Sequence, residues 1–79
     1  MDDRIWEAGW NRAQKLMRKG QAETLYLASD ADDAFAATVL AAAKAAGISP
    51  DQTKTGDQLA KMAGVEVFTA VLTAVKKQA

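Results

Sequence analysis

Apolar and polar residues at first follow a helical spacing along this chain. From about Asp3 to Lys19, apolar residues recur every three or four positions, and Gly20 follows as a typical helix-ending glycine, so the pattern predicts an amphipathic helix. Trp6 and Trp10 lie four residues apart on its apolar side, which favours packing in the core. Gly9 interrupts the segment and costs a helix up to about 1 kcal/mol relative to alanine, so a helix that begins only near Gly9 is the alternative.

The spacing then changes to that of a buried strand followed by a second helix. Thr24–Ala28 is a short apolar run with residues that favour β-structure, and it predicts a strand. Ser29–Asp33 supplies a helix N-cap and first-turn carboxylates, so a helix is expected over about Asp33–Ala46, closed by Gly47. The expected buried face of this helix consists of Phe35, Val39, Ala42, Ala43 and Ala46.

The middle of the chain predicts a polar connection and a short helix. Residues 48–54 are irregular and polar, and Pro50 permits at most an edge strand there. Thr55 and Gln58 have the spacing of a capping box, which predicts the start of a helix. Gly64 is expected to end this helix after about two turns.

The last apolar segment fits two kinds of structure. β-branched residues stand at every second position from Val65 to Val75, as in a strand, whereas an overlapping set of apolar residues has helical spacing. We expect a strand over about Phe68–Thr73. Helices and strands then alternate along the chain, which predicts the α/β class and a small three-layer α/β/α sandwich, formed by residues 1–79 as a single domain.

The composition excludes several classes of function. The chain contains neither cysteine nor histidine, so disulfides, thiolate or imidazole metal sites, cysteine nucleophiles and serine–histidine catalysis are excluded. No apolar run approaches the roughly 20 residues of a membrane span, and no signal peptide is recognisable at the start. We therefore expect a cytoplasmic protein that has no membrane partner.

The basic residues are concentrated in one place, although the chain as a whole is neutral, with 10 basic and 10 acidic residues. Four of them lie between Asn11 and Gly20, where no acidic residue occurs: Arg12, Lys15, Arg18 and Lys19. At about 100° per residue they share one side of a helix with Asn11, which favours contact with a polyanion. A solvated helix face is the alternative, because cations near a helix C-terminus also interact favourably with the helix dipole.

Five short motifs resemble one protein family, in register and without gaps between about Gly9 and Val71. They are Gly9–Lys15, Arg18–Gly20, Leu25–Asp32, Lys44–Ile48 and Leu59–Val67. The last of them, Leu-Ala-Lys-Met-Ala-Gly-Val-Glu-Val, is similar to a Leu-Gly-Lys/Arg-Ala-Cys/Val-Gly-Ile/Val-Glu-Val signature. Together the motifs resemble those of the kink-turn-binding ribosomal proteins of the L-seven-Ae and L-thirty-e type, which include short bacterial relatives.

The resemblance implies a fold and a function. The fold is the L-thirty-e-like sandwich, shortened at the N-terminus because few residues precede Gly9. The implied function is non-enzymatic binding of a kinked, internally looped RNA duplex in a ribonucleoprotein, without catalytic residues, metal or cofactor. The RNA-binding positions carried over are Asn11, Arg12, Lys15, Lys19, Asp32, Val65, Glu66 and Val67.

These positions have different roles in the family. In the family, an Asn-Glu pair reads the sheared G·A pairs, and a later lysine contacts the RNA backbone. In this chain Asn11 and Arg12 hold the positions of the pair, and Lys15 holds the position of the lysine. Asp32 matches an acidic position near an extruded base, and residues 65–67 match a loop that packs on the RNA bulge. Amide, cationic and small apolar groups suit base edges, phosphates and an unstacked base respectively.

Two exchanges depart from the family and leave other functions open. Arg12 replaces a glutamate or glutamine acceptor with a group that only donates, and Trp10 replaces a threonine. The alternative is a structural α/β module without RNA binding, in which a second copy covers an open sheet edge or apolar patch. Asp30 and Asp32 also stand where a magnesium site could follow a strand, although helix capping explains both residues as well.

Overall fold

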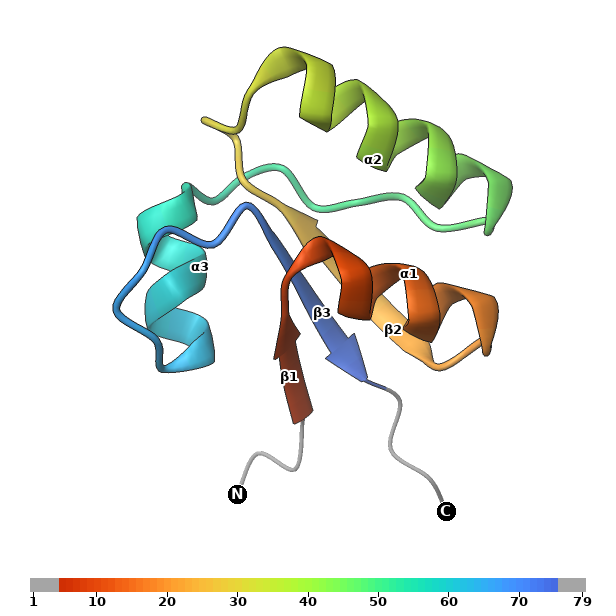
Figure 1. Ribbon diagram of the computed structural model, residues 1–79, viewed down its shortest axis with the longest axis horizontal. Helices are drawn as coiled ribbons and strands as arrows, with labels where there is room; N and C mark the ends of the chain where they lie inside the picture. The colour runs from red at the N-terminus through yellow and green to blue at the C-terminus, as the bar shows by residue number, and fades with distance from the viewer. Residues whose placement is uncertain (1–4, 76–79) are drawn as a thin grey trace.

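The structure is a computed structural model of the chain, and it describes residues 5–75. Six elements follow one another in this range (Figure 1): β1 (Ile5–Ala8), α1 (Trp10–Arg18), β2 (Ala22–Leu27), α2 (Asp33–Ala45), α3 (Gly56–Ala63) and β3 (Val71–Val75). The predicted α/β class is thereby confirmed. None of the helices in this range is long and apolar enough to cross a membrane.

Three strands of the described range form an antiparallel sheet in which β3 is central. The order is β1-β3-β2, so β3 pairs with both other strands. On the outer side of β2, the segment after α2 adds an isolated parallel bridge between Tyr26 and Asp51. The backbone of Asp51 donates to Leu25 O at 2.8 Å and accepts from Leu27 N at 2.9 Å. The edge strand that Pro50 permits is therefore reduced to a single bridge.

Successive residues of a strand point to opposite faces of the sheet, and each face has its own core. α1 and α2 cover one face, where the buried residues are Ala13, Leu25, Leu27, Val39, Ala43 and Val71. α3 covers the other face, where the buried residues are Tyr26, Ala28, Leu59 and Leu72. The helices therefore lie on both sides of the sheet (Figure 1), as the alternation of elements predicts.

The helix ends agree with the capping residues that the sequence predicts. Asp32 is the N-cap of α2, and Thr55 and Gln58 form a complete capping box at the start of α3. The Thr55 hydroxyl accepts from Gln58 N at 3.2 Å, and Gln58 Oε1 accepts from Thr55 N at 2.9 Å. Gly64 ends α3 with a left-handed φ of 74°, which favours glycine. The structure confirms these predictions. They could be made from the sequence because each cap depends on contacts within one helical turn.

The first element differs from the prediction. Residues 5–8 form a strand, whereas a helix was expected over Asp3–Lys19. Gly9 has a φ of 106°, which interrupts any helix, and its N donates to Val71 O at 3.0 Å. Pairing with the central strand therefore overrides the local helical spacing.

The two tryptophans consequently lie on opposite faces of the sheet. Trp6 packs on the α3 side, where its ring centroid lies 5.8 Å from that of Tyr26. Trp10 packs on the other side, where its ring meets Phe35 edge-on at 6.0 Å. Both tryptophans are half-buried against a core, as predicted. The prediction that they share one helical face is wrong, because Trp6 lies in β1 and Trp10 in α1.

The last strand begins later than expected. It starts at Val71, whereas a strand was expected over about Phe68–Thr73. Residues 65–70 form a connection outside the sheet, which we call the α3–β3 loop. Thr69 N donates to Gly56 O at 3.2 Å, which ties this end of the loop to the start of α3, and Ala70 O accepts from Ala28 N, just after β2, at 2.8 Å.

One buried hydroxyl among the described residues has no hydrogen-bond partner. Thr73, in the middle of β3, is fully buried, and its Oγ1 makes no hydrogen bond. Thr73 lies opposite Leu25 in the antiparallel ladder, so its side chain shares the face covered by α1 and α2. A hydroxyl that is buried without a partner lowers the free energy of unfolding.

Candidate nucleic-acid interface

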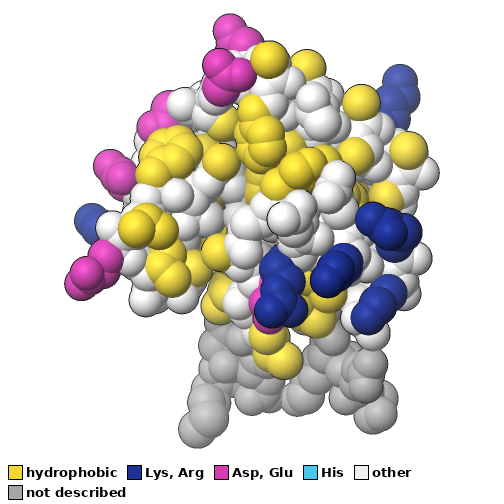
Figure 2. Space-filling view, viewed as in Figure 1, with side chains coloured by type: hydrophobic (Ala, Val, Ile, Leu, Met, Phe, Trp, Pro, Cys, Tyr) yellow, Lys and Arg dark blue, Asp and Glu magenta, His cyan; other side chains and the backbone are white. Residues whose placement is uncertain are grey.

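α1 places its apolar and basic residues on opposite sides. Ala13 is fully buried beneath the helix, Met17 packs against the same core, and the helix contains no acidic residue. The exposed polar residues are Asn11, Arg12, Lys15, Arg18 and the C-capping Lys19. We call the four cations among them, Arg12, Lys15, Arg18 and Lys19, the basic face. Figure 2 shows Lys and Arg side chains gathered over α1, with hydrophobic side chains exposed on the same view.

The residues predicted to meet the RNA bulge lie in the α3–β3 loop, and all three are exposed. Val65 is 38% exposed, Val67 is 70% exposed, and Glu66 between them also faces solvent. Phe68, the next residue, is 52% exposed. Val65 N donates to Ala60 O at 3.0 Å, which fixes the start of the loop against the end of α3. The loop therefore presents apolar side chains to solvent at a defined place.

A hollow of about 240 Å³ joins the α3–β3 loop to the start of α1. The bond from Gly9 N to Val71 O, at 3.0 Å, holds the start of α1 beside the end of the loop, and the first turn of α2 completes the rim. The lining side chains include Trp10 from α1, Phe35 from α2, and Val65, Val67 and Phe68 from the loop. We call it the aromatic hollow, after its three aromatic side chains.

The basic face begins next to the aromatic hollow and extends away from it along α1. Asn11 and Arg12 directly follow Trp10 in the helix. At about 1.5 Å per residue, Lys15 lies roughly 8 Å and Lys19 roughly 14 Å along the helix from Trp10. Around the helix, at about 100° per residue, both lysines point roughly away from Trp10, which packs on the apolar side of α1. A surface shared by the early helix and the late loop stays a prediction.

Asp32 has a structural role that accounts for its position. Its Oδ2 accepts hydrogen bonds from Ala34 N at 3.1 Å and from Phe35 N at 3.2 Å. These N–H groups have no partner within the helix, so the carboxylate caps α2. Asp32 is exposed and lies three residues before Phe35, which lines the aromatic hollow. The capping interpretation is confirmed, and a contact from this carboxylate to RNA stays a prediction.

The neighbouring carboxylate also serves a backbone group. Asp30 Oδ1 accepts from Gly56 N at 2.9 Å, which ties the turn after β2 to the start of α3. Within residues 5–75, no group of three or more His, Cys, Asp and Glu side chains could hold a metal ion. The magnesium interpretation therefore has no ligand set in this part of the chain, whereas both Asp30 and Asp32 bind backbone N–H groups.

Sequence reasoning missed three residues at this surface. Phe35 was expected only as part of a buried helix face, and Phe68 as part of a strand, yet both line the aromatic hollow. Gly56, the first residue of α3, is buried beneath Phe68, and a Cβ at this position would overlap the ring. A glycine just inside a capping box has no capping role, so its presence is the signal that indicates a close approach.

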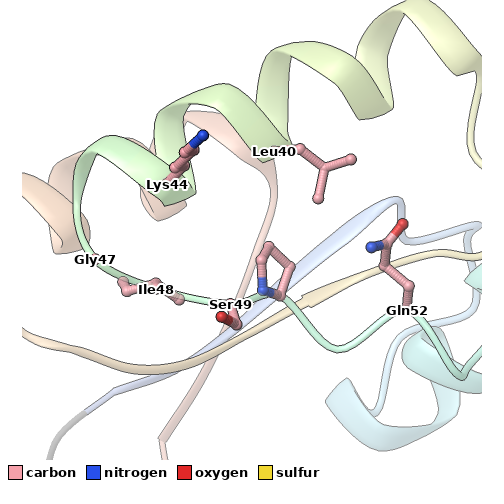
Figure 3. A pocket seen from close by; sticks show the side chains of 7 residues that line it. Leu40, Lys44, Gly47, Ile48, Ser49 and Gln52 are labelled. Carbon is pink, nitrogen blue, oxygen red and sulfur yellow. The ribbon is translucent and has the colours of Figure 1, made fainter.

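A second hollow, of about 540 Å³, lies between α2 and residues 47–52. Figure 3 shows Leu40 of α2 and Gln52 of the following segment on opposite sides of it. Its lining mixes apolar and polar side chains, Lys44 and Ile48 among them, and includes none of the predicted RNA-binding residues.

A local hydrogen-bond pattern lowers one pKa beside this second hollow. The hydroxyl of Thr53 donates to Asp51 Oδ1 at 2.6 Å, and the backbone N of Thr53 donates to the same atom at 2.9 Å. These two bonds, in that order, hold the pKa of the Asp51 carboxyl below its ordinary value, and the charge of Lys54 adds to the effect. The pattern stabilises the turn in which Asp51 bridges to β2.

A comparison of the sequence with protein-family models and with curated proteins found no match. What the chain binds is therefore inferred from its own residues and their arrangement.

Proposed function

We propose that this chain is a non-enzymatic RNA-binding domain for a kinked, internally looped duplex, acting in the cytoplasm within a ribonucleoprotein. The main observation behind the proposal is the aromatic hollow, which joins the start of α1 to the α3–β3 loop. These two segments are far apart in the sequence, and they are the two to which the resemblance assigns RNA contacts. Helices on both faces of the sheet also favour an L-thirty-e-like sandwich as the scaffold.

The chemistry of this surface suits an unpaired region beside a duplex. The amide of Asn11 can both donate to and accept from a base edge, and the ammonium of Lys15 can neutralise a phosphate. Arg12 offers only donors, so it suits the N7 and O6 acceptors of guanine, or a phosphate. The apolar lining of the hollow suits an unstacked base, which a plain duplex does not provide. Together these groups favour a looped RNA.

A titration of the full chain against two RNAs tests the proposal. One RNA is a kinked duplex with an internal loop, and the other is a fully paired duplex of the same length. We expect tighter binding to the looped RNA, with a log–log salt slope of roughly −3 if about three phosphates are neutralised. Equal affinity for the two RNAs, or no binding at moderate salt, would contradict the proposal.

Self-association is the second candidate, and the exposed apolar residues favour it. Ile5 in β1 is 58% exposed, and Val67 and Phe68 in the α3–β3 loop are also exposed. β1 lies at an edge of the described sheet, and such an edge can pair with a second copy. Sedimentation equilibrium at increasing concentration tests this candidate: a dimer would support it, and the mass of one chain throughout would contradict it.

A further inference from the structure

Phe68 is an exposed aromatic residue whose ring has a fixed place. The ring lies against Gly56 at the start of α3, where a Cβ would overlap it. Nevertheless, 52% of Phe68 is exposed, so contact with the protein uses only part of the ring surface. The remaining part is available to a partner.

Hydrogen bonds around Phe68 hold the α3–β3 loop in place. Thr69 N donates to Gly56 O at 3.2 Å, and Gly56 N donates to Asp30 Oδ1 at 2.9 Å. The hydroxyl of Thr69 donates to Val67 O at 3.2 Å, and so spans Phe68. Because the loop is already tied to α3 and to the turn after β2, a partner that binds the ring loses little affinity to ordering of the chain.

The surroundings of the ring favour a nucleobase as this partner. Phe68 and Trp10 line the same hollow, and Trp10 begins the helix that carries the basic face. Lys15 lies roughly 8 Å along α1 from Trp10 and about 140° around it, so an RNA strand whose phosphate contacts Lys15 must cross the start of α1 to place a base at the hollow. Trp10 and Phe35 are half-buried and meet each other edge-on, which leaves Phe68 as the most exposed aromatic ring of the hollow.

We propose that Phe68 is a stacking platform for one unpaired base of a bound RNA. The inference rests on the proposed RNA-binding function and adds an aromatic contact from a residue outside the positions that the resemblance carries over. Every base has a π face that can stack on an aromatic ring. The partner is an RNA with at least one unstacked base, because a base inside a duplex has no free face.

The test replaces Phe68 in the full chain and follows a fluorescent base. A set of looped RNAs carries 2-aminopurine at one unpaired position each, and stacking quenches its fluorescence. Phe68→Leu keeps an apolar side chain against Gly56 but removes the ring, whereas Phe68→Tyr keeps the ring. Ile5→Ala removes exposed apolar surface from β1 as a matched control. Thermal unfolding followed by circular dichroism checks that each variant folds.

We expect 2-aminopurine fluorescence at one position of the RNA to be quenched by the wild type, by Phe68→Tyr and by Ile5→Ala. Phe68→Leu is expected to lose this quenching and to bind the RNA about tenfold more weakly. Unchanged quenching and affinity in Phe68→Leu would overturn the stacking role while RNA binding stands. Binding by the wild type without quenching at any unpaired position would overturn it as well, whether or not Phe68→Leu folds.

Two further results separate this inference from the proposed function. Absence of RNA binding by the wild type would overturn the proposed function and, with it, the role of Phe68. A Phe68→Leu variant that binds RNA normally but loses self-association in sedimentation would assign the ring to a protein contact and overturn stacking alone.

Discussion

The ring of Phe68 fills the space in which a side chain at position 56 would lie, so Gly56 and Phe68 depend on each other. Gly56 does not have a positive φ, and glycine is therefore needed here for space and not for backbone conformation. The pair links the start of α3 to the loop that borders the aromatic hollow. A change at a buried helix residue can in this way alter the exposed surface around the aromatic hollow.

Alanine at position 56 is expected to displace the Phe68 ring. We expect Gly56→Ala to lower the free energy of unfolding by about 1–2 kcal/mol, as overpacking does, although alanine is the better helix former. In a Phe68→Ala background the same change should be neutral or stabilising. Urea unfolding of the four proteins measures this coupling, and equal effects of Gly56→Ala in both backgrounds would show that the two residues are independent.

Lys15 on the basic face is expected to contact a phosphate. Lys15→Ala should weaken binding to looped and paired RNA alike and reduce the size of the salt slope by about 1. Lys61 is the matched control, because it is exposed near the end of α3 on the opposite face of the sheet. Anisotropy titrations at several salt concentrations give both quantities. Equal losses in Lys15→Ala and Lys61→Ala would argue against a localised site.

The protein is expected to be more stable when Thr73 is replaced by an apolar residue of similar shape. Thr73→Val removes a buried hydroxyl without a partner and should raise the free energy of unfolding by about 1 kcal/mol. Thr69→Val is the control, because the buried Thr69 hydroxyl donates to Val67 O at 3.2 Å and its loss should destabilise. Denaturant unfolding measures both changes. A destabilising Thr73→Val would show that the hydroxyl has a favourable role.

The low pKa of Asp51 should depend on the Thr53 hydroxyl. Thr53→Ala is expected to raise this pKa toward the ordinary 3.8, whereas Thr53→Ser should keep it low. Because the folded-state pKa is lowered, the stabilisation is present above pH 3.8 and is lost as the pH falls through the folded-state pKa. NMR titration of the carboxyl carbon follows the pKa; an identical titration in the alanine and serine variants would assign the shift to other groups.

Features that depend on local chemistry could be predicted from the sequence. Asp32 caps α2 and Thr55 caps α3, because the side-chain oxygen of a capping residue reaches N–H groups two or three residues ahead. The exposure of Lys15 opposite the buried Ala13 likewise follows from helical periodicity. The basic side of the candidate site was therefore accessible to prediction.

Features that depend on contacts between residues distant in the sequence could not be predicted from local sequence patterns. Residues 5–8 have a spacing that also fits a helix, and only pairing with β3 makes them a strand. β3 starts only at Val71, and before it Thr69 is tied to Gly56, a contact that no local pattern indicates. The role of Phe68 at the hollow depends on the same tie. The aromatic side of the site therefore required the tertiary structure.

The central place of β3 affects how the chain is made. β1 and β2 are joined through β3 in the described sheet, so a nascent polypeptide cannot complete this sheet until residues 71–75 have left the ribosomal exit tunnel. Until that moment Leu25, Leu27 and Val39 lack part of their covering. Folding is therefore expected to follow translation of nearly the whole domain, and the emerging segment presents a transient target for chaperones.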